Sequence, residues 1–259
     1  MTLALLINRF CKLLGTLLKA ICYILYFFLP KLRFTIPTYS KAKIKSKNDT
    51  KIPKILWQTN FTNKVTLPVY VNYLFNRLMS LDWEYKYVST EDRLEFIREH
   101  GTKEQIEAFE QLTNGASQAD FWRLFVLNKV GGVYMDIDAH AVLPLSKLIK
   151  PEDKELILLT KHKYSNYFMA TAPNNKYLEK TLDLIVDNIQ NRRIGGGVYD
   201  LTGPTALNQA ISDDDIVNSR HNRYTCIQGS FTNEHFQYLD KPRGKWTHAS
   251  KDSLLKEKE

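Results

Sequence analysis

The chain has 259 residues, of which 44% are hydrophobic and 25% charged, so its composition excludes a disordered or fibrous protein. Residues 1–51 hold ten Lys/Arg and one acid, and the rest holds 36 − 10 = 26 basic and 28 − 1 = 27 acidic residues. The near-neutral remainder excludes a nucleic-acid-binding body, which would carry basic charge on a folded face. The three cysteines, Cys11, Cys22 and Cys226, lack the spacing of a metal site or disulfide framework, as expected in a reducing compartment.

The first 30 residues are predicted to form a membrane-associated helix. Polar residues recur there every three or four positions, between Leu, Ile and Phe: Asn8, Arg9, Lys12, Thr16, Lys19, Tyr23 and Tyr26. This pattern favours a cationic amphipathic helix lying in an anionic membrane surface. A spanning helix, which needs about 20 apolar residues, and a soluble helix packed on its own domain are the alternatives. The basic linker 31–51 then places the rest on the cytoplasmic face of the inner or plasma membrane.

Strand and helix patterns alternate in the next part of the chain. Strands are expected at 52–57 and 85–89, and helices at 67–81, from residue 90 and at 103–112. This alternation predicts a parallel α/β sheet with a nucleotide at its carboxyl edge, within one domain spanning 52–250. Residues 251–259 are predicted to be a charged, mobile tail.

The most informative stretch is residues 116–144. Ser117 is a candidate N-cap for a helix that Gly131 and Gly132 would end, because glycine accepts left-handed backbone angles at little cost. A buried strand, Val133–Met135, follows, with Asp136 and Asp138 at i and i+2. Side chains at i and i+2 of an extended segment point to the same side.

Two carboxylates in that position indicate a site for Mg²⁺ or Mn²⁺, which take hard oxygen ligands and share substrate phosphates. Asp-x-Asp alone would favour a solvated turn, but the preceding buried strand and Gly-Gly pair favour the metal. Asp120 and Arg123 share a helix face at i and i+3, where they can form an intrahelical ion pair.

These motifs resemble the glycosyltransferases with a DXD sugar-binding region, which include yeast initiating α-mannosyltransferases and bacterial capsule and lipopolysaccharide enzymes. The resemblance rests on Ala-x-x-x-Asp-x-x-Arg followed by Gly-Gly-x-Tyr-x-Asp-x-Asp. Ile52–Gln58 and the Thr202-Gly203-Pro204 turn agree with it. It implies a single Rossmann-like nucleotide-sugar-binding domain of the GT-A type.

The resemblance also implies residue roles. Asp120 and Arg123 would reach the donor sugar, Asp136 the ribose and the metal's water shell, and Asp138 the metal. Trp57 would lie near the nucleotide base, although a core tryptophan is an equal alternative. Relatives carry a His followed by Ser-Trp near the C-terminus. Here the order differs, and His248, with His235 in reserve, is the candidate third metal ligand.

The function so implied is a metal-dependent retaining glycosyltransferase of bacterial surface polysaccharide synthesis. It would move a sugar from a nucleotide sugar, UDP in preference to GDP, to a glycan or lipid-linked acceptor. A haloacid-dehalogenase-type phosphatase also uses Asp-x-Asp after a strand, with Asp213, Asp214 and Asp215 as its later acids, but His140 departs from its pattern. A non-catalytic membrane-surface scaffold is the other alternative.

Overall fold

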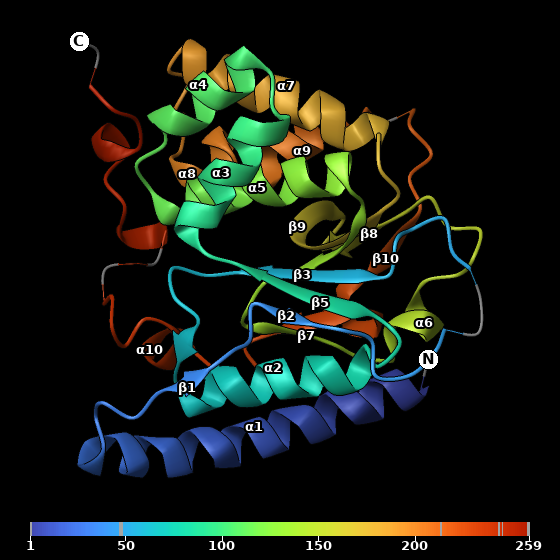
Figure 1. Ribbon diagram of the computed structural model, residues 1–259, viewed down its shortest axis with the longest axis vertical. Helices are drawn as coiled ribbons and strands as arrows, with labels where there is room; N and C mark the ends of the chain where they lie inside the picture. Colours follow the sequence, from blue (N-terminus) through green and yellow to red (C-terminus); the bar gives the residue numbers. More distant parts are fainter. Residues whose placement is uncertain (1, 47–48, 213, 243, 245, 258–259) are drawn as a thin grey trace.

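The computed structural model describes residues 2–46, 49–212, 214–242, 244 and 246–257 (Figure 1). The helices are α1 (Thr2–Phe28), α2 (Leu67–Met79), α3 (Thr90–His100), α4 (Lys103–Gln111), α5 (Gly115–Lys129), α6 (Leu145–Leu148), α7 (Lys176–Gln190), α8 (Val198–Leu201), α9 (Pro204–Ala210) and α10 (Glu234–Gln237). Short 3₁₀ turns lie at Asn222–Tyr224, Trp246–His248 and Lys251–Ser253. The strands are β1 (Phe34–Thr35), β2 (Tyr39–Ser40), β3 (Ile55–Thr59), β4 (Lys64–Val65), β5 (Glu84–Val88), β6 (Gly132–Met135), β7 (Ala139–Ala141), β8 (Glu155–Thr160), β9 (Lys163–Thr171), β10 (Ser219–His221) and β11 (Cys226–Gln228).

The elements form layers around a seven-stranded sheet of order β10-β8-β9-β6-β3-β5-β2. Helices α3, α4, α5, α7, α8 and α9 gather on one side of it, and α2 lies on the other with α1 outside α2 (Figure 1). Each face of the sheet has its own buried apolar cluster, one around α5 and α7 and one around α2. The architecture is therefore mixed α/β with the sheet buried on both faces.

The sheet is mixed, and the prediction of a parallel sheet was wrong for half of it. Strands β5, β3 and β6 are parallel, but β9 runs antiparallel to both β6 and β8. The cause is a two-residue hairpin between β8 and β9. Lys161 and His162 both have positive φ there, 46° and 68°, as a tight hairpin turn requires.

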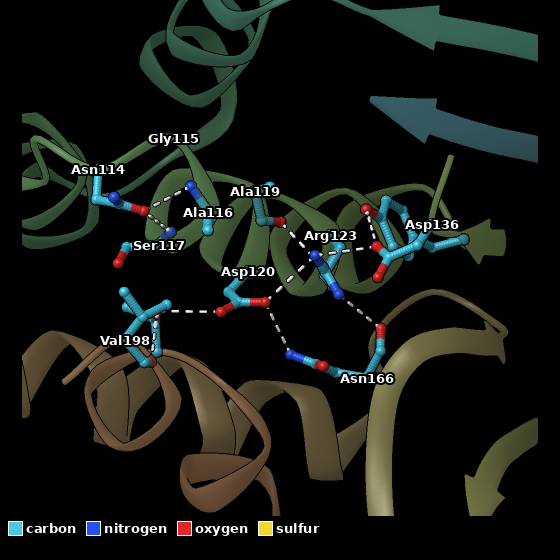
Figure 2. Close-up of polar contacts among 12 residues, drawn as sticks. Asn114, Gly115, Ala116, Ser117, Ala119, Asp120, Arg123, Asp136, Asn166 and Val198 are labelled. Carbon is cyan, nitrogen blue, oxygen red and sulfur yellow. Dashed lines mark hydrogen bonds and ion pairs between the residues drawn. The ribbon is translucent and has the colours of Figure 1, made fainter. Parts of the chain in front are cut away.

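Helix α5 and strand β6 are joined by the predicted Gly-Gly pair, at φ 78° for Gly131 and 112° for Gly132. The predicted N-cap at Ser117 was wrong. The helix begins three residues earlier, and the cap is Asn114, whose side chain accepts hydrogen bonds from the backbone N–H groups of Ala116 and Ser117 (Figure 2). Ser117 is fully buried inside the first turn instead.

The two terminal segments contact the α/β body. In the segment 31–51, β1 pairs with β4 and β2 extends the main sheet beside β5. Near the C-terminus, Leu254 and Leu255 are buried, and Leu255 forms a β-bridge with Leu112. The described part of 251–257 is thus anchored by two leucines, in contrast to the mobile tail expected from its charge. Residues Leu3–Phe28 of α1 are, by length and composition, sufficient to cross a membrane.

Candidate active site

Arg123 is the centre of a buried polar cluster at the carboxyl end of β6. Its Nη2 lies 3.3 Å from Asp120 Oδ1 on the same helix and 3.1 Å from Asp136 Oδ1 after the strand (Figure 2). Its Nη1 donates to the backbone oxygen of Asn166 on β9 (3.0 Å). The guanidinium stacks over the ring of Tyr134, 4.5 Å from its centroid. One arginine therefore ties α5 to two strands of the sheet.

Asp120 is held on both of its oxygens. Oδ1 accepts from Asn166 Nδ2 (3.0 Å), and Oδ2 accepts from the hydroxyl of Thr202 (3.2 Å). Thr202 belongs to the Thr-Gly-Pro turn, so the structure brings that turn to the cluster. Burial raises the pKa of Asp120 to about 6, against the opposing effect of the Arg123 charge. The carboxylate is thus oriented rigidly, with hydrogen-bonding capacity left for a ligand hydroxyl.

The two aspartates of Asp-x-Asp lie on a turn, not on an extended segment. The N–H of Ala139 donates to the backbone oxygen of Asp136 (3.0 Å), which closes the turn over Ile137 and Asp138. Both carboxylates nevertheless face one group. Gln228 Nε2 lies 3.2 Å from Asp136 Oδ2 and 3.3 Å from Asp138 Oδ1.

Gln228 reaches this position through strand pairing. Strand β11 runs antiparallel to β7, with Gln228 opposite Ala139, the residue that follows Asp138. The N–H of Gly229 also donates to the backbone oxygen of Asp138 (3.0 Å). Burial and mutual repulsion raise the pKa of Asp138 to about 7, and burial raises that of Asp136. The pair therefore carries negative charge that lacks full compensation.

Buried amides hold the backbone of this turn. Asn72 Nδ2 donates to the oxygens of Ile137 and Ala139, both at 2.8 Å, and Asn76 Nδ2 donates to Ala139 at 2.7 Å. Gln58 on β3 donates to the oxygen of Asp136 (3.2 Å). Sequence reasoning missed these residues. The available signal was two asparagines at i and i+4 on the apolar face of a predicted helix.

A cavity of about 570 Å³ opens beside the cluster. The polar cluster lines it with Asp120, Arg123, Asp136, Asn166 and Gln228, and other sides are formed by Asn60, Phe61, Arg93, Ser165, Tyr167, Tyr199, Pro204, Tyr238 and Lys241. Its size and its mixture of rings and polar groups suit a small-molecule ligand.

Arg93 is a buried cation in the wall of this cavity. Its guanidinium donates to the Thr90 hydroxyl (2.8 Å) and to the backbone oxygen of Gly115 (3.3 Å). It has no ion-pair partner among the residues that the structure describes. Burial without a partner lowers the pKa of Arg93 to about 10. An anionic ligand group would supply the missing charge.

The remaining candidate residues from the sequence do not join this cluster. Trp57 is a core residue whose indole donates to the backbone oxygen of Gly131 (3.0 Å) and packs edge-on against Trp122. His248 is exposed and lies 3.7 Å from Glu234, and His235 stacks on Tyr23 of α1. Asp213 falls outside the described residues, and its neighbour Asp215 pairs with Lys176 away from the cavity.

Comparison with known proteins identifies the region that contains this cluster. Residues 68–155 match the family described as glycosyltransferase sugar-binding region containing DXD motif. Residues 68–155 therefore carry a sugar-binding region of the glycosyltransferase type. Asp120, Arg123, Asp136 and Asp138 all lie within the matched residues, and the protein is a transferase enzyme of this kind.

A solved glycosyltransferase structure is similar to this chain in fold. The structure titled "PaToxG Glycosyltransferase" shares 21% identity, over 61% of this chain and 68% of that one, with a TM-score of 0.51. The ligand-free glycosyltransferase domain from the YGT toxin shares 14% identity over 61% of this chain and 57% of that domain, with a TM-score of 0.39. No curated protein matches the chain.

The donor set of this glycosyltransferase fits a hard divalent cation held in part by substrate. The described residues include no group of three or more His, Cys, Asp or Glu side chains able to hold a metal, so His248 does not join the aspartates. Two carboxylates and the side-chain oxygen that Gln228 would present after rotation remain. Mg²⁺ and Mn²⁺ are commonly bound by one or two carboxylates, with waters and substrate phosphates completing the shell.

Proposed function

We propose that the protein is a metal-dependent retaining glycosyltransferase of the GT-A type that uses a nucleotide-diphosphate sugar. The observation that carries the proposal is the double contact of Arg123 with Asp120 and Asp136, which joins the helix motif and the Asp-x-Asp motif at one cavity. The resemblance of both motifs to the DXD family supports the same function.

The donor sugar would bind at Asp120 and Arg123. A guanidinium donates in fixed directions and a carboxylate accepts from hydroxyls, so the pair can select the arrangement of the sugar's hydroxyl groups. Asn166 and Thr202 act as positioning residues, because they fix both oxygens of Asp120. Asp136 would receive the ribose hydroxyls, and the ring of Phe61 in the cavity wall offers a surface on which the base can stack.

The diphosphate would lie between the aspartate pair and the basic side chains of the cavity. Asp136, Asp138 and Gln228 would hold Mn²⁺ or Mg²⁺, which when bound offsets charge on the leaving diphosphate. Arg93 and Lys241 line the same cavity and supply further positive charge. Together with Arg123 they would stabilise the negative charge that develops as the donor bond breaks.

In the transfer step, the bond between the anomeric carbon and the diphosphate oxygen breaks, and its electron pair stays on the diphosphate. The acceptor oxygen bonds to the anomeric carbon and its proton passes to the diphosphate. Asp120 and Asp136 are each engaged by Arg123, which argues against either acting as a covalent nucleophile. This front-face route would retain the configuration of the sugar. A glycan or lipid-linked acceptor of bacterial surface polysaccharide synthesis is proposed on the resemblance alone.

The test is donor turnover. The protein is incubated with a panel of UDP- and GDP-sugars and Mn²⁺, and release of the nucleoside diphosphate is followed with and without candidate acceptor glycans. Asp138→Asn should abolish release, and Asp183→Asn, an exposed control on α7, should leave it unchanged. Release of inorganic phosphate from small phosphoesters would instead favour a phosphatase, and the absence of any turnover or nucleotide-sugar binding would favour a scaffold.

A further inference from the structure

Helix α1 packs against the body through its polar side. The buried and half-buried residues of this side recur every three or four positions, as Ala4, Asn8, Cys11, Gly15, Lys19, Cys22 and Tyr26, and Leu5, Ile7, Leu18 and Leu25 are half-buried beside them. In a soluble protein the apolar side of a surface helix faces the core. In α1 the apolar side faces away from the core instead, which indicates that something other than the body of the protein covers it.

Hydrogen bonds hold this polar side along most of the helix. Asn8 Nδ2 donates to the backbone oxygen of Arg223 (2.5 Å), and Lys19 Nζ donates to the oxygens of Gly229 and Ser230 (3.0 and 2.9 Å). Near the end of the helix, the hydroxyl of Tyr26 accepts from the N–H of Leu67 (2.7 Å).

The close approach at the middle of α1 depends on a glycine. A Cβ at Gly15 would lie 1.9 Å from the backbone oxygen of Ser230, so no larger residue fits without displacing the helix. Cys22 and Tyr26 pack against Phe236 in a small apolar cluster of their own. The docked position of α1 is therefore built into the fold by polar, steric and apolar contacts.

The outer side of α1 is apolar over its whole length and is exposed. The large hydrophobic residues on it, with 42% to 80% of their surface accessible, are Leu3, Leu6, Phe10, Leu13, Leu14, Leu17, Ile21, Ile24, Phe27 and Phe28. On α2, which packs beside α1, Leu74 and Leu78 are also exposed. Exposed apolar surface of this extent marks an interaction site.

Positive charge accompanies this apolar surface. Arg9 and Lys12 are exposed on α1, and Lys31, Lys41, Lys43 and Lys45 are exposed in the segment that follows it. Residues 1–51 contain one acidic residue, Asp49. Such a surface is complementary to anionic headgroups over an apolar layer. Two copies of the chain facing each other here would bring cations together.

We propose that α1 lies in the plane of an anionic lipid bilayer, with its outer apolar side among the acyl chains and its polar side bound to the catalytic body. A membrane-spanning α1 would have to leave the body, so Asn8 and Lys19 would lose their present partners, and Arg9 and Lys12 would enter the membrane with them. The in-plane position keeps every contact described above. This inference does not depend on the proposed glycosyl transfer.

The in-plane helix also connects the membrane to the active site. Lys19 binds the oxygens of Gly229 and Ser230, which directly follow Gln228, the residue between Asp136 and Asp138. Ser230 in turn contacts His140 Nε2 at 2.9 Å. The same short loop thus contacts the lipid-facing helix on one side and the aspartate turn on the other.

The test is sedimentation with vesicles. The full chain should sediment with vesicles containing phosphatidylserine and to a lesser degree with pure phosphatidylcholine. The double variant Ile21→Asp/Ile24→Asp should lower the partition coefficient about tenfold or more, because two apolar side chains no longer enter the lipid. Ile216→Asp, an equally simple change at an exposed isoleucine outside α1, should have no effect. Melting temperatures verify that all variants fold.

Failure of the wild-type chain to bind anionic vesicles would overturn the proposal. So would a dimer, measured by light scattering, that the double variant dissociates, because the outer face would then be covered by a second copy. Depth measurements separate the in-plane helix from a span. A dye on cysteine at Leu6, Leu17 or Phe28, which lie on nearly one face, should be quenched alike by shallow brominated lipids. Deep quenching at Leu17 with shallow quenching at both other positions would mean a span.

Discussion

Arg123 Nη2 lies 3.1 Å from Asp136 Oδ1, although the two residues belong to a helix and to the end of a strand on opposite sides of the Gly-Gly turn. Arg123 and Asp120 are buried and Asp136 is half-buried, so water screens the three charges poorly and each affects the ionisation of the others. The sugar-binding motif and the Asp-x-Asp motif are therefore one structural unit.

Arg123→Ala should remove the contact that joins the sugar-binding motif to the Asp-x-Asp motif. It leaves the buried carboxylate of Asp120 and the half-buried one of Asp136 without their cation, and we expect the free energy of unfolding to fall by about 3–5 kcal/mol. Arg123→Lys keeps the positive charge but loses the planar, forked set of N–H donors of the guanidinium. This variant should therefore keep most of its free energy of unfolding and lose most of the donor turnover. Urea unfolding and nucleotide release measure the two effects separately. Wild-type turnover in Arg123→Lys would contradict the proposed contact with the donor.

Trp57 and Phe61 should respond in opposite ways. Trp57→Phe removes the hydrogen bond to Gly131 from the core and should cost about 1–2 kcal/mol of stability, with donor affinity unchanged. Phe61→Ala should weaken nucleotide binding by about 1–3 kcal/mol if the base stacks on this ring, with little loss of stability. Calorimetric titration of each variant with the nucleoside diphosphate measures these affinities. A loss of affinity in the folded Trp57→Phe protein would restore the role first predicted for Trp57.

The Gly-Gly turn should tolerate no side chain at its first position. Gly131 has φ 78°, and a Cβ there would lie 2.9 Å from the backbone oxygen of Thr171. We expect Gly131→Ala to destabilise the fold by about 1–3 kcal/mol. Gly115→Ala is the matched control, because it lies in α5 with no atom within 4 Å of the new Cβ. Equal melting temperatures for the two variants would contradict the geometry of the turn.

Metal binding should strengthen with pH. In the metal-free protein, burial raises the pKa values of Asp120 to about 6 and of Asp138 to about 7, above the ordinary value of 3.8. The folded state then binds more protons than the unfolded chain between pH about 4 and 7, so stability falls as pH rises through this window. Mn²⁺ binds the deprotonated pair and should raise the melting temperature more at pH 8 than at pH 5.5. In Asp138→Asn this dependence should largely disappear, and a pH-independent Mn²⁺ effect in the wild type would argue against binding at the pair.

Local patterns predicted much of the fold. Helices α2, α3 and α4 begin at the expected residues 67, 90 and 103, and the Gly-Gly pair ends α5 as predicted, because both depend on neighbouring residues. The direction of β9 was missed, since Lys161-His162 lacks the glycine or asparagine that usually marks a two-residue hairpin. The inward polar face of α1 was also beyond prediction, because helical periodicity does not tell which face meets the protein.

The candidate site was predicted only where its residues are close together in the sequence. Asp120, Arg123 and Asp136 are close in sequence and meet in the structure. Gln228 is 90 residues from Asp138 and arrives only through the pairing of β7 and β11. No spacing rule reveals such a partner, and the search for a third ligand was directed to His248.

The most direct measurement is calorimetric titration of nucleotide sugars, each with and without Mn²⁺, into the wild type, Asp138→Asn and Gln228→Leu. We expect one nucleotide sugar to bind only with the metal, with binding lost in Asp138→Asn and weakened in Gln228→Leu. Binding that ignores the metal and survives in Asp138→Asn would contradict a metal-dependent glycosyltransferase site at Asp136 and Asp138.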